Sequence, residues 1–371
     1  MKIVMFGHKR IPSREGGVEI VVEELSSRMA HLGHAVTCYN RAGHHVSGAQ
    51  FDAGAKNSCN GVKIKTVWTV DKKGLAAVSS SFFSAICSAF SSAHVVHIHA
   101  EGPAFMCWLP KLFGKKIVVT VHGLDWQRAK WKQGFGAKYI RMGEKMAVRF
   151  ADEIIVLSQG VQQYFQDTYG RETVFIPNGV SKPEKREAQE IVETFGLQAG
   201  EYILFLGRLV PEKGITYLID AFKQLHTDKK LVIAGGSSDT DDFAAELKAQ
   251  AATDNRILFT GFVQGRLLEE LYSNAYIYVL PSDLEGMPLS LLEAMSYGNC
   301  CVTSDIEECA AVIENKGITF PKSDVAALRD VLQKLCDDPV QVAFYQQDAS
   351  EYITRRFNWD DVARKTLELY K

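Results

Sequence analysis

Short apolar runs of strand length recur along the whole chain, and most are followed by a glycine or polar turn and then by apolar residues at helical spacing. Residues 2–6, KIVMF, show the pattern, because they lead through a loop to a predicted helix that begins near Gly17. Strands that alternate with helices form parallel sheets, so the chain is predicted to have an α/β fold. The predicted strands are residues 2–6, 34–40, 94–99, 116–123 and 153–158 in the first half, and 202–206, 230–234, 257–263, 275–280 and 299–305 in the second.

The length and the charge distribution both indicate two domains. A chain of 371 residues exceeds what one hydrophobic core usually supports. Residues 1–180 hold 22 Lys and Arg against 13 Asp and Glu, whereas the remainder holds 20 against 31, so a basic half precedes an acidic half. We expect a first domain at residues 1–180, a second at 181–355, and an amphipathic helix within the last segment, 356–371.

The composition favours a cytoplasmic protein. Eight cysteines are scattered without C-x-x-C pairs, which fits free thiols better than disulfides or a zinc site. The first residues do not resemble a signal peptide, and the Ser-rich stretch 75–90 is too short to span a bilayer and is expected to be a packed helix. Nucleic acid is not an expected partner, since the chain is slightly acidic overall and carries no recognised nucleic-acid-binding module.

Two cations follow the predicted strand at residues 202–206. Arg208 lies two residues beyond the strand, and Lys213 precedes a helix expected to begin near Ile215. Each alone is typical of a surface residue. As a pair beside a glycine turn at a strand end, they would offset the charge of a diphosphate.

Two glutamates, Glu285 and Glu293, lie in the segment PSDLEGMPLSLLEAMSYGNC at residues 281–300. The first is expected in a loop after a strand and the second on a helix that begins at Leu289. A glutamate near a helix start is commonly a capping or dipole residue. A helix N-terminus between two carboxylates would also suit a ligand with a charged middle and hydroxyls at both ends, which is the shape of a nucleotide sugar.

The first half offers weaker candidates at its predicted strand ends. Gly16 and Gly17 precede the first helix, where they could form an ordinary turn or allow close approach of a phosphate or sugar. His122 ends a strong strand and could be a hydrogen-bonded strand cap. With Asp125 and Trp126 it could equally line a sugar pocket, which combines polar groups with an aromatic face.

No metal site is expected. His97 and His99 would share one face of a strand, but no acidic or cysteine partner lies near them at metal-site spacing. The pair Asp239 and Asp241 forms a D-x-D pattern, yet helix capping and solvation in a polar loop explain it.

Seven basic residues and one acid, Glu144, lie in residues 126–150, interleaved with aromatic residues and Met. Such a run is most often a solvated helix face, but basic amphipathic segments also dock on anionic lipid surfaces. An anionic membrane surface is therefore an expected further partner. The predicted membrane-facing residues are Arg128, Lys130, Lys132, Lys138 and Arg141.

Together these motifs resemble the retaining glycosyltransferases of family 4, which have the GT-B fold. Two stretches of the first half, RIPSREGGVEIVVEEL at 10–25 and VHGLDWQRAKW at 121–131, are also similar to bacterial polysaccharide transferases that add rhamnose or related hexoses. The resemblance implies two Rossmann-like parallel-sheet domains facing a central cleft, with the last helix crossing back to the first domain. The matching stretches are the Gly-Gly pair, VHG at 121–123, IPNGV at 176–180, GRLVPEKG at 207–214, GFV at 261–263, EGMPLSLLEAM at 285–295 and the final F-x-W segment.

The resemblance also implies a role for each matched residue. Glu285 would bind hydroxyls of the donor sugar and Glu293 the ribose hydroxyls, while Arg208 and Lys213 would hold the diphosphate. His122 would face the transferred sugar and is implied, with Glu285, Arg208 and Lys213, as a catalytic residue. The remaining implied contacts are the backbone of Gly286, Met287, Pro288 and Leu289 along the sugar and phosphate, Gly16 and Gly17 near the donor, and Asp125 and Trp126 at the acceptor.

The implied reaction moves a hexose or deoxyhexose from a nucleoside-diphosphate sugar to a glycan or lipid-linked acceptor, with retention and without a metal or other cofactor. UDP and dTDP are the favoured nucleotides, and cell-surface polysaccharide assembly is the implied setting. Two alternatives remain, a sugar-nucleotide epimerase of the same architecture and a non-catalytic two-lobed sugar-binding protein. The first normally lacks the paired glutamates, and the second would usually carry a signal peptide. The base, sugar, acceptor, linkage and oligomeric state are left open.

Overall fold

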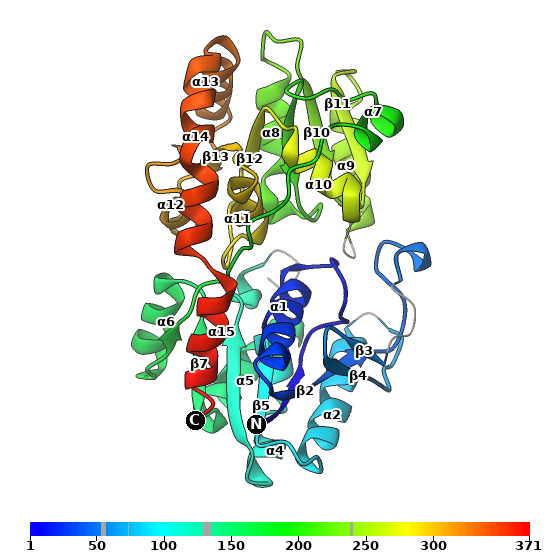
Figure 1. Ribbon diagram of the computed structural model, residues 1–371, viewed down its shortest axis with the longest axis vertical. Helices are drawn as coiled ribbons and strands as arrows, with labels where there is room; N and C mark the ends of the chain where they lie inside the picture. The colour runs from blue at the N-terminus through cyan, green and yellow to red at the C-terminus, as the bar shows by residue number, and fades with distance from the viewer. Residues whose placement is uncertain (53–56, 73, 129–134, 238–239) are drawn as a thin grey trace. The chain divides into compact units, whose positions relative to one another are not determined.

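The computed structural model describes residues 1–52, 57–72, 74–128, 135–237 and 240–371. The chain divides into two compact units (Figure 1). Unit 1 is formed by Met1–Asn178 together with Trp359–Lys371, and unit 2 by Gly179–Asn358. The sequence placed the domain boundaries at residues 180 and 355, whereas the compact units change at residues 178 and 358.

Unit 1 contains an eight-stranded sheet in the order β3-β4-β2-β1-β5-β6-β7-β8. All neighbours are parallel except β3 and β4, which pair antiparallel. The chain runs outward from β1 in one direction and then, from β5, in the other, so the topological switch point lies between β1 and β5. The strands are β1 Lys2–Phe6, β2 Ala35–Arg41, β3 Ser58–Cys59, β4 Val62–Val67, β5 Val95–His99, β6 Lys116–Val121, β7 Glu153–Val156 and β8 Val174–Phe175.

Strand β4 is absent from the sequence prediction, and its side chains explain why. Val62, Ile64 and Val67 are buried, while Lys63 and Lys65 between them are exposed. A strand covered on one face alternates apolar and polar residues, so it forms no continuous apolar run of the kind that identified the central strands.

The core of unit 1 lies between the central strands and the helices that cover them. The Ser-rich stretch is a packed helix as predicted, α2, which buries its serine face. The last helix, α15 (Trp359–Glu368), packs on α1 (Gly17–His31) within this unit, where Arg28 Nε donates to Asp360 at 2.8 Å (Figure 1). The other helices are α2 Leu75–Ala89, α3 Glu101–Ala104, α4 Trp108–Leu112, α5 Phe135–Phe150 and α6 Gln159–Tyr169, with 3-10 turns η1 Ala49–Phe51 and η2 Asp125–Gln127.

Unit 2 contains a six-stranded, fully parallel sheet in the order β11-β10-β9-β12-β13-β14. This is the doubly wound order, with its switch point between β9 and β12. The short central strands β12 and β13 are buried along their whole length. Strand β12 is an unbroken apolar run, as expected for a strand covered on both faces, whereas β13 also buries the polar residues Thr303 and Ser304. The strands are β9 Tyr202–Leu206, β10 Lys230–Ala234, β11 Ile257–Gly261, β12 Ile277–Leu280, β13 Cys300–Ser304 and β14 Ile318–Phe320.

Helices connect successive strands of unit 2, as parallel pairing requires (Figure 1). They are α7 Glu190–Phe195, η4 Pro211–Lys213, α8 Ile215–Phe222, α9 Asp241–Ala251, α10 Gly265–Ser273, α11 Leu289–Ser296, α12 Glu307–Ile313, α13 Val325–Asp337 and α14 Pro339–Arg356.

Candidate functional site

The two loops that carry the predicted site residues of the second half meet at the switch point of unit 2. One loop follows β9 and holds Arg208 and Lys213, and the other follows β12 and holds Glu285. Because β9 and β12 are neighbouring parallel strands, both loops leave the same edge of the sheet. Ligands of doubly wound sheets bind at this position.

Glycines allow these two loops to pack closely. Gly214 has φ +65°, and a Cβ there would lie 2.0 Å from the carbonyl oxygen of Pro281, so only glycine fits between η4 and the second loop. The loops are joined further by a hydrogen bond from Asp283 N to the carbonyl oxygen of Glu212 at 2.8 Å. The positions of Lys213 and Glu285 are therefore fixed by main-chain contacts.

Lys213 and Glu285 form an ion pair, with Lys213 Nζ 2.6 Å from Glu285 Oε1. Ser282 also donates its hydroxyl to Glu285 Oε1 at 2.6 Å. The two side chains are 13% and 9% exposed, so each charge is largely removed from water and is compensated mainly by the other. The pair offers a cation for phosphate oxygens beside a carboxylate that accepts hydrogen bonds from hydroxyls.

Glu293 lies on α11, eight positions after Glu285 in the sequence. Tyr272 donates its hydroxyl to Glu293 Oε2 at 3.2 Å, which orients the carboxylate. The predicted main-chain segment from Gly286 to Pro288 ends at the N-cap of this helix, where no side chain caps the first N–H groups. Leu289 is the first helical residue, as predicted. Arg208 lies in the loop after β9 and is partly buried.

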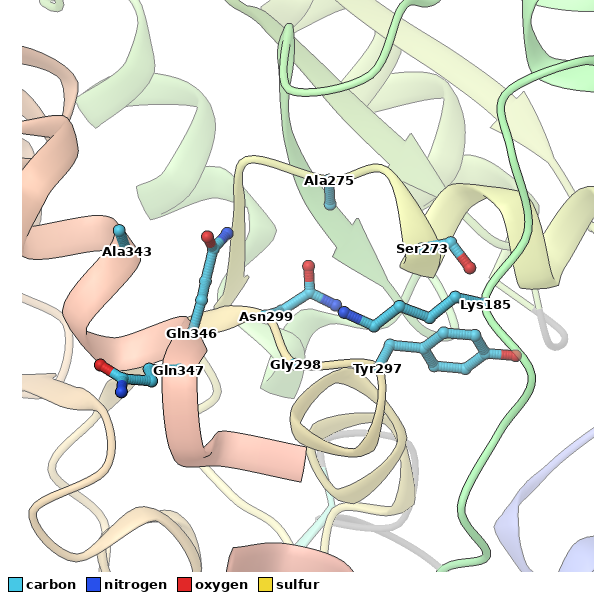
Figure 2. Close-up of a pocket in the computed structure, with 9 residues that line it drawn as sticks. All are labelled: Lys185, Ser273, Ala275, Tyr297, Gly298, Asn299, Ala343, Gln346 and Gln347. Carbon is cyan, nitrogen blue, oxygen red and sulfur yellow. The ribbon is translucent and has the colours of Figure 1, made fainter. Parts of the chain in front are cut away.

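A pocket of about 270 Å³ lies elsewhere in unit 2 and contains none of the predicted site residues (Figure 2). Its wall includes Tyr297, whose ring stacks on Tyr272 with centroids 5.3 Å apart, and Lys185, whose Nζ lies beside Gly298. The pocket adjoins the end of α11, where Tyr297 N also donates to the carbonyl oxygen of Glu293 at 3.1 Å.

In unit 1, polar side chains gather where β5 and β6 end. His99 Nδ1 lies 3.1 Å from Nε2 of His122, and the rings of His97 and His99 lie with centroids 4.2 Å apart. His97 in turn contacts the hydroxyls of Thr120 at 2.7 Å and Tyr370 at 2.6 Å. His97 and His99 share a face as predicted, and these three imidazoles form a row from the C-terminal segment to His122.

All three histidines of the row are buried, and this sets their charge. Desolvation, together with the neighbouring His122, lowers the pKa of His97 to about 3. Desolvation lowers the pKa of His122 to about 4, although Asp125 and Glu19 act in the opposite direction. Burial and the other histidines hold the pKa of His99 well below its usual range. The row is therefore neutral at neutral pH, and His122 offers hydrogen bonds rather than a positive charge.

Asp125 and Trp126 lie in η2, which begins four residues after the end of β6. Asp125 N donates to Glu101 Oε2 at 2.8 Å, and Arg128 Nε lies 3.0 Å from Asp125 Oδ1. The guanidinium of Arg141 lies over the Trp126 ring, 4.3 Å from its centroid. His122, Asp125 and Trp126, which are near neighbours in the sequence, thus each have a defined partner in unit 1.

The basic residues expected to form one membrane-facing surface behave differently from one another. Arg128 is bound to Asp125, so its charge is compensated, and Arg141 is exposed but lies on Trp126. Lys138 is exposed, while Lys130 and Lys132 lie outside the described residues. Glu144, the one acid of this run, does not lie on a solvated face: it is fully buried and accepts hydrogen bonds from the hydroxyls of Tyr164 and Tyr169.

Gly16 and Gly17 form the start of α1, with Gly16 at the N-cap and no side chain capping the helix. Gly16 lies close to Glu19, since a Cβ there would lie 2.9 Å from Glu19 Oε2. Glu19 itself accepts a hydrogen bond from Lys9 N at 2.8 Å.

Sequence reasoning missed several residues of these sites. Gly7, directly after β1, has φ +111°, and a Cβ there would lie 2.1 Å from the carbonyl oxygen of His99, so it allows β1 and β5 to approach at the switch point. A glycine directly after the first strand was a readable signal. Glu101 carried none, because its carboxylate meets Asp125 N from a segment 24 positions away. Ser282 lies only three positions before Glu285, but a serine in a turn gives no sign that its hydroxyl will bind that carboxylate.

No group of three or more His, Cys, Asp or Glu side chains in the described ranges is placed to hold a metal ion. Asp239 lies outside those ranges, and Asp241 begins α9. Over the same residues, no helix is long and apolar enough to cross a membrane.

Two protein-family models match the chain, one in each half. Glycosyltransferase Family 4 matches residues 15–182, and Glycosyl transferases group 1 matches residues 200–338. An uncharacterized glycosyltransferase of Methanocaldococcus jannaschii is 25% identical over 399 residues, which cover 100% of this chain and 98% of that protein. The alpha-maltose-1-phosphate synthase of Mycolicibacterium smegmatis is 26% identical, with 76% of this chain and 79% of that protein covered.

Solved structures share the fold over nearly the full length. An Anabaena protein crystallised with UDP and glucose superposes with a TM-score of 0.81, covering 99% of this chain and 98% of its own, at 17% sequence identity. The two parallel-sheet units of this chain therefore have the GT-B architecture, as the sequence predicted.

Proposed function

Because the chain belongs to the GT-B glycosyltransferases, we propose that it moves a hexose or deoxyhexose from a nucleoside-diphosphate sugar to a glycan or lipid-linked acceptor, with retention of the anomeric configuration. Support for this donor class comes from the Anabaena structural neighbour, which was crystallised with UDP-glucose. No feature of the described site favours a second candidate function, in which the chain binds sugars without transferring them.

The Lys213–Glu285 ion pair at the switch point of unit 2 carries the proposal. In the donor complex, the diphosphate takes the place of the carboxylate as the partner of Lys213, and Glu285 accepts hydrogen bonds from sugar hydroxyls. Arg208, on the same loop, supplies a second cation, and Glu293 accepts hydrogen bonds from the ribose. The free protein keeps both charges compensated until a ligand with matching groups replaces each partner.

The chemistry follows from these positions. The bond from the anomeric carbon to phosphate breaks with oxocarbenium character, and the cations of Lys213 and Arg208 stabilise the departing diphosphate. The acceptor hydroxyl attacks from the side of the leaving group and gives its proton to a phosphate oxygen, so no protein nucleophile is needed. Because two side chains supply the positive charge, we propose that the reaction proceeds without a metal ion.

Unit 1 is proposed to hold the acceptor through Asp125 and Trp126, with a neutral His122 donating or accepting a hydrogen bond at the transferred sugar. We further propose that α5 docks on an anionic membrane surface, which would suit a lipid-linked acceptor and a role in cell-surface polysaccharide assembly. Exposed side chains on this helix recur at helical spacing and include no acid. They are Lys138, Arg141, Met142, Lys145 and Arg149.

A thermal-shift panel with UDP, dTDP, GDP and ADP and their common sugar conjugates, in EDTA, tests the donor proposal. A ligand at a hundredfold excess over its Kd should stabilise the protein by about 2.7 kcal/mol. We expect one nucleotide to stabilise the wild type and to lose its effect in the Arg208→Ala/Lys213→Ala variant. Binding only after Mg²⁺ or Mn²⁺ is added would contradict the metal-free mechanism, and no binding at all would contradict the donor site.

A product analysis tests the stereochemistry. With the bound donor and a panel of acceptors, proton NMR of the new glycosidic linkage should show the anomeric configuration of the donor. An inverted product would refute retention.

A further inference from the structure

Two buried carboxyl groups lie beneath the segment that carries Asp125 and Trp126. Glu101 is the first residue of α3, two positions after the end of β5, and Glu144 lies in the middle of α5. Both are buried, at 1% and 0% exposure. Gly143 brings the two helices into main-chain contact, because a Cβ there would lie 2.0 Å from the carbonyl oxygen of Glu101. The neighbouring Glu144 is thereby held against Glu101.

One oxygen of each carboxyl has no hydrogen-bond donor in the part of the chain that the structure describes. Glu144 Oε1 accepts from the hydroxyls of Tyr164, at 2.8 Å, and Tyr169. Glu101 Oε2 accepts from Asp125 N at 2.8 Å. Glu101 Oε1 and Glu144 Oε2 are both buried, and no N–H or O–H of the described residues reaches either atom.

Two ionised carboxylates at this position would be costly. Buried like charges repel each other, and a buried acceptor without a donor loses its hydration without compensation. The nearby charged groups do not relieve the repulsion, since Asp125 is itself an acid and Arg128 is bound to Asp125. One proton held between Glu101 Oε1 and Glu144 Oε2 would give both atoms a hydrogen bond and remove one charge.

We propose that Glu101 and Glu144 share one proton, and that this carboxyl pair is a positioning device for the acceptor segment at Asp125 and Trp126. In the proposed arrangement Glu101 donates through Oε1 to Glu144 and accepts the Asp125 N–H through Oε2. The inference rests on the proposed function, in which Asp125 and Trp126 meet the acceptor. Neither glutamate touches substrate, so both act through the segment above them.

The pair supports both residues of the segment. Glu101 holds the main chain at Asp125. Glu144 holds the hydroxyl of Tyr164, whose ring lies near that of Trp126 with centroids 6.1 Å apart. Loss of the shared proton would therefore disturb the main chain of Asp125 on one side and the support of Trp126 on the other.

The electrostatics agree with a protonated Glu101. Burial, and then the neighbouring carboxylates of Asp125 and Glu144, raise the pKa of Glu101 well above its usual range. Burial raises the pKa of Tyr164 to about 12, with Glu144 acting in the same direction, so Tyr164 stays protonated and continues to donate. Because the folded protein retains a proton that an unfolded chain releases, the shared proton stabilises the fold at low pH and this contribution is lost as the pH rises.

The pH profile of transfer tests the proposal. Glu101→Gln supplies an N–H donor to Glu144 and an oxygen to Asp125 N without needing a proton. We expect the wild type to lose activity at alkaline pH through a rise in the KM for acceptor, and Glu101→Gln to be active without that alkaline loss. Glu153→Gln, a change on β7 outside these contacts, should keep the wild-type profile. An unchanged alkaline loss in Glu101→Gln would overturn the proposal.

A second variant separates positioning from folding. Glu101→Ala removes the donor to Glu144 and the acceptor for Asp125 N, so we expect at least a tenfold rise in the KM for acceptor. The thermal shift produced by the donor nucleotide, which reports unit 2, should match that of the wild type. Restoration by glutamine but not by alanine identifies the hydrogen bonds as the cause, whereas an equal loss of donor binding would contradict a positioning role.

Infrared difference spectroscopy reads the proton without any assay of transfer. The wild type at neutral pH should show the C=O stretch of a buried protonated carboxyl, and the band should be missing in Glu101→Gln. Absence of the band in the wild type would refute the shared proton even if transfer is confirmed. Its presence would support the shared proton even if the donor proposal fails.

Discussion

The candidate sites of the two units are built from opposite kinds of polar group. In unit 2, a lysine and a glutamate form an ion pair at 2.6 Å at the switch point. In unit 1, the histidine row is buried and uncharged, and a carboxyl pair beneath Asp125 is proposed to hold one proton. The first arrangement suits a ligand with a fixed charge such as a diphosphate, and the second suits a neutral ligand recognised through hydroxyl groups.

The difference teaches how each site can respond to its surroundings. In an ion pair, each side chain can exchange its partner for a group of the ligand without gaining or losing a proton. Buried neutral groups keep their hydrogen bonds only while they neither gain nor lose a proton. A change of pH is therefore expected to lower the stability of unit 1 before that of unit 2.

Acid should therefore unfold unit 1 first, and this is the largest effect we predict. Desolvation lowers the pKa of His97 to about 3 and that of His8 and His122 to about 4, from 6.5. Below pH 6.5 the unfolded chain binds protons that the folded unit does not, so stability falls as pH decreases toward 4. Three such histidines give a slope of about 4 kcal/mol per pH unit.

The tryptophans allow this prediction to be measured. All five lie in the sequence of unit 1, so tryptophan fluorescence follows that unit alone, while hydrogen exchange of unit 2 peptides follows the other. Replacing the exposed His226 of unit 2 by Gln serves as a control and should not move the transition. Loss of protection in unit 2 at a higher pH than the fluorescence change would break the comparison.

Loss of either member of the charged pair should nearly abolish transfer. We expect Lys213→Ala and Glu285→Ala to lower kcat by about 10²–10³-fold, the usual result of removing one electrostatic contact to a developing charge. Steady-state kinetics with the identified donor provide the measurement. Lys316→Ala, which breaks a more exposed ion pair with Asp348 in the same unit, should leave kcat unchanged. A folded Glu285→Ala protein with full activity would contradict the assignment.

Glu293 should contribute to nucleotide binding rather than to the chemical step. Glu293→Gln keeps an oxygen for the Tyr272 hydroxyl but removes the charge that strengthens a hydrogen bond to ribose. We expect about tenfold weaker binding of the nucleoside diphosphate by calorimetry, with kcat little changed. Glu307→Gln on the exposed start of α12 provides the matched control. Unaltered affinity would remove Glu293 from the site.

Membrane binding is the smallest expected effect. Each exposed lysine near an anionic surface contributes about 1 kcal/mol, so Lys138→Gln/Lys145→Gln should reduce binding to phosphatidylserine vesicles by about fivefold per residue. Lys63→Gln/Lys65→Gln on β4 removes the same charge from another exposed part of unit 1. Equal losses in both variants would show a general charge effect and no role for α5.

The sequence predicted the parts of the fold that follow from local patterns. Apolar runs identified the central strands, and glycine turns with helical spacing located α8 and α11. Strand β4 was missed because its residues alternate between buried and exposed, and the burial of Glu144 was not predicted. A buried carboxylate on a basic helix has no sequence signature, since its partners Tyr164 and Tyr169 come from the next helix.

The candidate site was predictable only as separate candidates. Lys213 and Glu285 were named from strand ends and turn residues, but they are 72 positions apart, and their contact depends on the order of β9 and β12 in the sheet. Glu101 could not be found from the sequence, because its role depends on a main-chain N–H in another loop.

Hydrogen exchange with and without the nucleotide selected by the thermal-shift panel tests the central claim most directly. We predict protection of peptides covering residues 207–214 and 281–293, and loss of that protection in the Lys213→Ala variant. Protection elsewhere with these two loops unchanged would contradict the assignment of the donor site to the switch point of unit 2.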